Sequence, residues 1–536
     1  MTRRADPLRP RLRSRQVPSL SSEADPSPPG GAPGSPQGAD ASRRRLATGA
    51  SGAAVLLASI DAYVVVTILN SIIRDLGIPI DELQRATPII TGYLLGYVAA
   101  MPLLGQLSDR FGRTRVLQGS LLAFAAGSAL SALAHSLAFL VGARVLQGAA
   151  AGALLPVTFA VVGDQWDEAT RTVPLGIVGA VQELGSVLGP LYGALIAAAI
   201  GWRGLFWVNI PLAVAAMAVV GRTHPGRDAR PGQRVDLVGG LLLAAGLALL
   251  IIGLYNPDPA NGVLPTWGPW VVAIGVAVLI GFVVWERRTP TRLLTPAPGK
   301  LPPFAAALGT SFLSGVALMV TLIDVPLVAE TVLVKNNLQA ALLLLRFLVA
   351  LALGAAAGGA LARRLGERPV ALGGLLVAAG AFLRVAAWPV AILAARYHLG
   401  PVSLPRLDVD LALAGLGLGV VVAPLASVVL RVSSVEDHGA ASAGVVAARM
   451  MGMLVGIGAL AAWGLHRFHV LTAHLAPPLP SFSGGAAYNA ALAVYENAVQ
   501  AAFHVEYAEI FRITAVVCVA AAVWALALGG RRLRSP

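Results

Sequence analysis

Long runs of apolar residues recur along the chain from Leu46 to Gly529, separated by short polar stretches. Each run has about 20 residues, which is enough for a helix to cross a hydrocarbon core about 30 Å thick. A helix pairs its own backbone polar groups, as a segment inside lipid must. The pattern predicts spans near 46–72, 84–106, 115–134, 137–162, 173–200, 204–221, 235–254, 268–285, 304–329, 337–362, 369–394, 408–430, 439–466 and 505–529.

The composition agrees with a bilayer as the solvent. Hydrophobic residues make up 56% of the 536 positions and charged residues only 12%, whereas a soluble domain has about 25% charged residues. We therefore predict an all-α polytopic membrane protein. The single cysteine, Cys518, lies inside the last apolar run, so the sequence offers neither a disulfide framework nor a Cys-rich metal site. We predict no metal site and no cofactor.

The positive charge is explained by topology. The net charge is +13, but the arginines fall in short loops between apolar runs and form no basic domain, so we expect no nucleic-acid partner. An even number of spans places both termini on one side. The loops of that side, near 110–115, 222–234, 287–300 and 363–368, are rich in Arg and Lys, as cytoplasmic loops are. We expect a multi-pass inner-membrane protein with both termini in the cytoplasm.

The spans group into two halves. We predict a disordered basic cytoplasmic tail at 1–45, a six-helix bundle at 46–221, two linker transmembrane helices at 222–300, a second six-helix bundle at 301–530 and a short cytoplasmic tail at 531–536. The first 42 residues lack an apolar region followed by a cleavage site, so they are not read as a signal peptide.

A long polar segment at 467–506 connects the last two predicted spans on the outer side. It is too long for a tight connection, and Ala486–Glu506 has many helix-forming residues and few breakers. We expect a long outer loop or a helical extension of the last span. The halves also show a weak internal repeat, because the segment Gly105–Arg113 has a counterpart in Gly359–Glu367. Repeats of this kind place a substrate path between the halves.

The loop after the second span is the first candidate for chemistry. Its small residues let two helix ends approach, while its charges can exchange partners as the helices move. We predict a conformational gate formed by Gly105, Asp109, Arg110, Gly112, Arg113 and Asp164. In this gate Asp164 pairs with Arg113 and holds one state. The alternative is that Asp164 is a solvated charge at a helix end.

Ionisable residues inside spans are the second candidate, because such groups are costly in a membrane and are functional by default. Asp61, Glu183 and Asp324 are carboxylates within predicted spans, and Arg144 and Arg449 are the cations. A carboxylate in a low dielectric can load and release a proton when an arginine approaches or withdraws. We predict that these five residues couple transport to protons. The alternative is a set of fixed ion pairs that only hold helices together.

A stripe of small residues marks the fifth span. Gly185, Gly189 and Gly193 recur every four residues and so share one helix face. Such a stripe often reflects close packing alone. Pro190 adds a bend, which favours a functional stripe along which the two halves slide. Glu183 lies beside this stripe.

Several of these motifs resemble those of the major facilitator superfamily. Gly-x-Leu-x-Asp-Arg-x-Gly-Arg from Gly105 resembles its signature loop, and Arg144-Val-Leu-Gln-Gly148 is similar to its fourth-helix motif. Gly185-x-x-x-Gly-Pro-x-x-Gly193 resembles the antiporter motif, which implies export. Asp61 with Thr67 and Asn70, and the Trp202–Pro211 segment, resemble the fourteen-span drug:proton antiporter branch. The resemblance implies a major facilitator fold of two six-helix bundles plus two linker helices.

A narrower resemblance concerns the mycobacterial triacylglyceride exporters of that branch. Segments Ser59–Thr67, Ala100–Gly105, Gln182–Gly193 and Val235–Gly240 look like theirs, and the similarity runs from about Ala50 to Gly529. It implies proton-coupled lipid export with a lipid-carrying periplasmic lipoprotein as partner.

The expected function is therefore proton-coupled export of triacylglyceride-like lipids or apolar compounds by alternating access. A general multidrug:proton antiporter for cationic amphiphilic drugs is the alternative. An enzyme is not expected, because the eight histidines are scattered without metal-ligand spacing. A passive channel lacks its filter sequence, and no phosphate loop supports ATP coupling. The expected partners are the lipid or drug substrate, protons and membrane lipids, and we expect a monomer.

Overall fold

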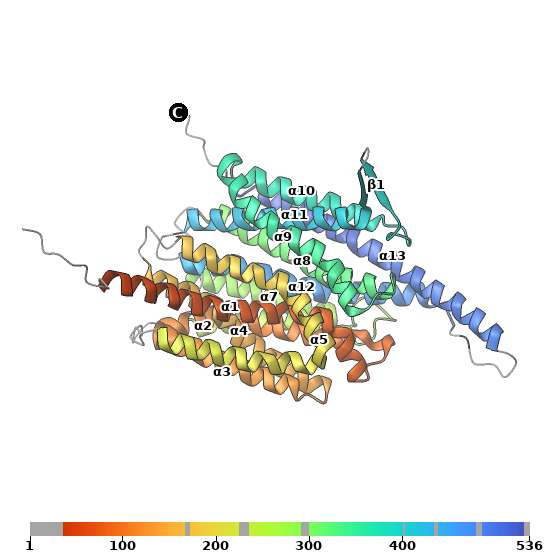
Figure 1. The fold of residues 1–536 in the computed structure, drawn as a ribbon, viewed down its shortest axis with the longest axis horizontal. Coiled ribbons are helices and arrows are strands. Elements are labelled where there is room, and N and C mark those ends of the chain that lie inside the picture. The colour runs from red at the N-terminus through yellow and green to blue at the C-terminus, as the bar shows by residue number, and fades with distance from the viewer. Residues whose placement is uncertain are drawn as a thin grey trace, which may run out of the picture. The chain divides into compact units, whose positions relative to one another are not determined.

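The computed structural model describes residues 36–166, 172–223, 235–290, 300–399, 402–433, 438–476, 478 and 485–529. Figure 1 shows long helices running side by side. The first seven are α1 (Pro36–Asp75), α2 (Thr87–Phe111), α3 (Arg113–Ala132), α4 (Leu137–Gln165), α5 (Thr172–Thr223), α6 (Leu237–Leu254) and α7 (Gly268–Arg288), with a 3-10 helix η1 (Ile80–Ala86) before α2. The others are α8 (Leu301–Thr331), α9 (Asn337–Leu365), α10 (Glu367–Ala386), α11 (Arg406–Val432), α12 (His438–Thr472) and α13 (Gly485–Ala525).

The apolar runs fold as helices, as predicted. Among the described residues, 12 helices are long and apolar enough to cross a membrane. α3 is outside that set, although it covers the predicted span at 115–134. α5 covers two predicted spans, because its 52 residues form two arms joined at Gly201, whose φ of 77° breaks the helix. Every predicted span thus has a helical counterpart, and a count of fourteen crossings stays a prediction.

The helix ends differ most from the predicted spans in three places. α1 begins at Pro36 and not near Leu46, because residues 36–45 contain good helix formers and continue the helix beyond the apolar run. α10 ends at Ala386 instead of 394, shortly before Pro389, which cannot continue a helix. α13 begins at Gly485 and so includes the segment 486–506 for which a helical extension was expected. The residues 1–35 and 531–536 of the predicted tails lie outside the described residues.

A small β-hairpin follows α10, which the apolar pattern did not predict. β1 (Arg396–Leu399) pairs antiparallel with β2 (Val402–Pro405). The buried carboxylate of Asp410 on α11 accepts hydrogen bonds from Arg384 at 2.7 Å, Trp388 at 2.9 Å and Tyr397 at 3.2 Å. Asp410 therefore ties the hairpin to the end of α10.

The two halves repeat the same close helix contact. A Cβ built on Gly148 of α4 would lie 2.1 Å from the backbone oxygen of Tyr93 on α2, and one built on Gly415 of α11 would lie 2.2 Å from that of Phe347 on α9. Only glycine fits at such an approach. The internal repeat seen in the sequence thus has a structural counterpart, and rigid helix pairs position the polar residues described below.

Candidate functional site

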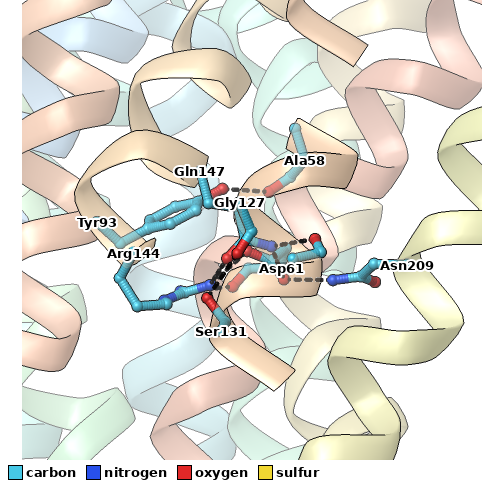
Figure 2. Close-up of polar contacts among 9 residues, drawn as sticks. Ala58, Asp61, Tyr93, Gly127, Ser131, Arg144, Gln147 and Asn209 are labelled. Atoms are coloured by element: carbon cyan, nitrogen blue, oxygen red, sulfur yellow. Dashed lines mark hydrogen bonds and ion pairs between the residues drawn. The ribbon is translucent and has the colours of Figure 1, made fainter. Parts of the chain in front are cut away.

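A buried ion pair lies at the centre of the first half. Arg144 on α4 donates from Nη1 to the carboxylate of Asp61 on α1 at 2.7 Å, and from Nη2 to its backbone oxygen at 3.3 Å. Both residues are only 1% exposed. Figure 2 shows the two side chains facing one another. Two desolvated charges persist only when they are paired and hydrogen-bonded, so this pair ties α1 to α4.

Further polar residues complete this pair, and the sequence reading missed them. Asn209 on the second arm of α5 donates to Asp61 at 2.7 Å, and Gln147 donates to it at 3.2 Å (Figure 2). The Arg144 guanidinium lies 4.1 Å from the ring centroid of Tyr93 on α2, within cation–π range. The network therefore joins α1, α2, α4 and α5. Its signal in the sequence was the Trp202–Pro211 motif, which contains Asn209.

A second ion pair joins the two halves. The guanidinium of Arg449 on α12 donates to the carboxylate of Glu183 on α5, and both side chains are largely buried. Near it the hydroxyl of Tyr63 on α1 lies 3.7 Å from the sulfur of Met453 on α12. The structure thus brings together two residues that the sequence could only place in separate spans.

The predicted gate loop is organised around Arg113. This residue pairs with Asp109 at 2.7 Å and also with Asp164 at the end of α4. The expected contact between Arg113 and Asp164 is therefore present. Arg110 instead lies over the ring of Phe111, 5.4 Å from its centroid. An added Cβ on Gly105 would lie 3.5 Å from Pro156 of α4, an ordinary contact, so the approach of α2 to α4 does not require a glycine at this position.

The second half has an ion pair at the place that corresponds to Arg113–Asp164, with the acidic and basic residues exchanged. Gly112 and Gly366, with φ of 97° and 91°, form the same turn between α2 and α3 and between α9 and α10. After Gly366, Glu367 pairs with Arg431 at the end of α11 at 3.6 Å, where the first half has an arginine paired with an aspartate. The sequence repeat indicated the turn but not the partner, because Arg431 is distant in sequence.

The glycine stripe on α5 packs within one half. A Cβ on Gly185 would lie 2.3 Å from that of Ser59 on α1, and one on Gly193 would lie 2.5 Å from a side-chain carbon of Val64. Pro190 accepts a hydrogen bond from Thr67 of α1 at 3.0 Å. The nearest neighbours of these glycines thus belong to α1 of the same half, and sliding of the two halves along the stripe stays a prediction. Glu183, next to the stripe, pairs with Arg449 of the second half.

Asp324 stands apart from the other predicted residues. It is 7% exposed on α8, and within the described chain it has no hydrogen-bond or ion-pair partner. Its charge interacts with that of Glu506 on α13, which is also 7% exposed. Among the described residues, no three His, Cys, Asp or Glu side chains are grouped so as to hold a metal.

Contacts at the predicted outer end also join the halves. Asn70 near the end of α1 donates to Glu330 on α8. Asn337, at the start of α9, donates to the hydroxyl of Ser71 at 3.1 Å. Sequence reasoning did not find these contacts, since uncharged amides carry no strong signal.

Comparisons with known proteins agree with this architecture. The family model described as Major Facilitator Superfamily matches residues 52–457. A triacylglyceride transporter of Mycolicibacterium hassiacum is 52% identical over 496 residues, covering 91% of this chain and 92% of its own. One of Mycolicibacterium smegmatis is 49% identical, covering 91% and 88%, and one of Mycobacterium tuberculosis is 48% identical, covering 91% and 95%.

A solved structure shows the same fold at low sequence identity. The human organic anion transporter MFSD10 (TETRAN) matches with a TM-score of 0.54 and 18% identity, over 89% of this chain and 99% of the other. At this identity the likeness concerns the fold alone.

Proposed function

Because this chain belongs to the Major Facilitator Superfamily, we propose that it exports triacylglyceride-like lipids from the inner membrane by proton-coupled alternating access. The observation that carries the proposal is the ion pair of Glu183 with Arg449, which joins the two halves in the interior. Relatives about half identical over most of their length are named triacylglyceride transporters, and their name supports the substrate class.

In this proposal the proton acts on the contact between the halves. Glu183 holds Arg449 while its carboxylate is charged, and protonation of Glu183 removes the charge that Arg449 needs. The halves can then separate. The Glu183–Arg449 contact is therefore made in one state of an alternating-access cycle and broken in the other. The Asp61–Arg144 network is a second carboxylate and arginine pair in the first half. It carries the proton or keeps α1, α4 and α5 together during the movement.

The gate around Arg113 acts at the cytoplasmic side. Its contacts with Asp109 and Asp164 join α2, α3 and α4, so breaking them loosens the ends of these helices together. The charge-exchanged pair of Glu367 with Arg431 serves the same purpose in the second half. These residues control conformational exchange and do not touch the substrate.

The outer part of α13 is proposed to take the lipid onward. Between Tyr488 and Asn497 most of its residues are exposed, whereas Gln500 donates to the backbone of Val332, just after α8. A triacylglyceride has almost no water solubility, so it needs an acceptor when it leaves the membrane. We propose a lipid-carrying lipoprotein as that acceptor.

A multidrug antiporter for cationic drugs is the second candidate. Asp324 and Glu506 favour it, because two buried carboxylates without a cationic partner in the described chain would attract a cationic substrate.

One experiment separates the two candidates. Proteoliposomes containing the full chain are given an imposed pH gradient, and the movement of labelled triacylglycerol is compared with that of a cationic dye. Gradient-dependent movement of triacylglycerol that Glu183→Gln removes supports lipid export. Movement of the dye alone would refute lipid export and support the drug antiporter.

A further inference from the structure

A cavity of about 280 Å³ lies where the two halves meet the linker helix α6. Its walls come from the first turns of α2 and α4, the last turn of α6 and the segment of α12 from Gly458 to Leu465. Side chains such as Leu95, Val145 and Ile252 make the lining apolar. None of the lining residues in the described chain is charged.

The helices around this cavity are otherwise closely packed. A Cβ on Gly96 would lie 2.3 Å from the backbone oxygen of Val145, so α2 and α4 touch directly at one wall. On the α12 wall, the nearest atoms to a Cβ added on Gly458 would be side-chain atoms of Ile251 and Leu254, at 3.4 Å, an ordinary contact distance. The absence of a larger side chain at Gly458 therefore leaves space between α12 and α6.

An apolar guest fits this space better than water. A water molecule needs two to four polar partners, which the aliphatic part of the lining around Leu95, Val145 and Ile252 does not supply. An empty space of this size would forfeit the dispersion contacts of its lining. The four helices that form the walls are all candidate membrane spans, so acyl chains are the available apolar molecules.

The polar atoms near the cavity indicate which lipid it takes. They belong to uncharged residues, among them Gln84, Thr87, Thr91 and Tyr255. The side-chain amide of Asn256 is already bonded to Gly262 and Asp258 in its own loop. The neighbouring cation, Arg85, is exposed and paired with Glu82. An anionic headgroup would lack a free cation there, whereas uncharged amide and phenol groups suit the ester groups of a neutral lipid.

We propose that this cavity binds an acyl chain of a neutral acylglycerol, with the ester end toward Tyr255 and Gln84. The inference rests on the proposed transport of neutral lipids and adds a site for them outside the Glu183–Arg449 contact. It also gives the linker pair a role, since α6 supplies one wall.

The test uses a triacylglycerol that carries a photoreactive group in one acyl chain. The full chain in nanodiscs is irradiated with this probe, and labelled peptides are mapped by mass spectrometry. Labelling is expected on the segments 87–95 and 458–465. Ala461→Phe, which fills the cavity, should reduce this labelling about tenfold, since it displaces about two methylene groups. Ala277→Phe on the exposed face of α7 is the matched control and should change nothing.

A second variant keeps the test decisive if Ala461→Phe does not fold. Gly458→Leu enters the same space from the α12 wall and should reduce labelling in the same way. Three results would overturn the site: no labelling of the two segments, unchanged labelling in both filled variants, or equal labelling by a photoreactive phosphatidylglycerol.

Transport is measured separately in proteoliposomes. Labelling without triacylglycerol transport would refute the proposed function and support the site, whereas transport without labelling would refute the site alone.

Discussion

The carboxylate of Glu183 on α5 is paired with the guanidinium of Arg449 on α12, and this contact ties the first half of the protein to the second. Since the partners belong to different halves, a change of charge on either one acts on the separation of the halves. The pair of Arg467 with Glu509, at 2.8 Å, differs in lying within the second half. The two pairs therefore offer a matched comparison.

We predict that Glu183→Gln lowers gradient-driven lipid transport at least about tenfold, the effect of losing about 1.4 kcal/mol of coupling. Glutamine keeps the shape of the side chain but cannot release a proton, so the remaining transport should no longer depend on pH. Initial rates in proteoliposomes across a series of pH values measure both effects. Glu509→Gln is the control and should keep the pH dependence. A normal pH profile in Glu183→Gln would remove this residue from coupling.

Asp61→Asn should abolish transport and also lower stability. The substitution leaves the buried Arg144 without its counter-charge, and breaking a buried pair in this way costs about 3–5 kcal/mol. Asn209→Leu removes only one hydrogen bond to the carboxylate and should cost less, about 1.5–3 kcal/mol. Thermal unfolding of the purified proteins in the same detergent shows which variant loses more stability. Equal stability of Asp61→Asn and the unmodified protein would contradict the role of the ion pair in the fold.

Arg113→Gln should slow turnover with little change in substrate affinity, because Arg113 holds Asp109 and Asp164 at the ends of the helices and lies away from the apolar interior. Arg115→Gln is the control, since Arg115 is an exposed arginine in the same first turn of α3 and is not one of the predicted gate residues. Lipid binding and transport rate are measured for both variants. If Arg113→Gln lost binding selectively, the gate assignment would be wrong.

Gly148→Ala should destabilise the protein by about 1–3 kcal/mol, the usual cost of overpacking, because the added Cβ would lie 2.1 Å from the backbone of Tyr93. Gly119→Ala on α3 meets nothing within 4 Å and should be neutral or slightly stabilising, since alanine favours a helix over glycine. Thermal unfolding of both variants tests the contrast. Equal stability would show that α2 and α4 can move apart freely.

Removing eleven residues, 487–497, shortens the outer part of α13 by about three turns and keeps the helical register. The cut ends before Gln500, whose contact with α8 anchors the helix, so insertion and folding should be unaffected. We expect lipid transfer to a lipoprotein acceptor to fall, and efflux of a small dye to change less. A variant with the same length of alanine-rich helix is the control. Full lipid transfer by the shortened protein would refute the docking role.

Much of the fold could be predicted from the local pattern. Apolar runs long enough to span a bilayer can form only helices there, so the helices follow from residue order alone. Contacts between residues close in sequence could also be predicted. Asp109 and Arg113 lie four residues apart and pair with each other, and Gly112 between them adopts a φ of 97° that favours glycine. The ends of α1 and α10 were less certain, because they depend on helix propensity and on a hairpin tied by Asp410.

The partners of the charged residues depended on tertiary structure. The sequence identified Asp61, Arg144, Glu183 and Arg449 as costly charges inside spans, but their pairing joins residues as far apart as Glu183 and Arg449. Such pairing is set by which helix faces meet. The sequence also could not show that the glycine stripe of α5 faces α1, since helical spacing defines a face but not its neighbour. Residue order thus determined which helices form and marked some of the charges inside them, while the packing of the helices decided which charges meet and buried others, such as Asp410.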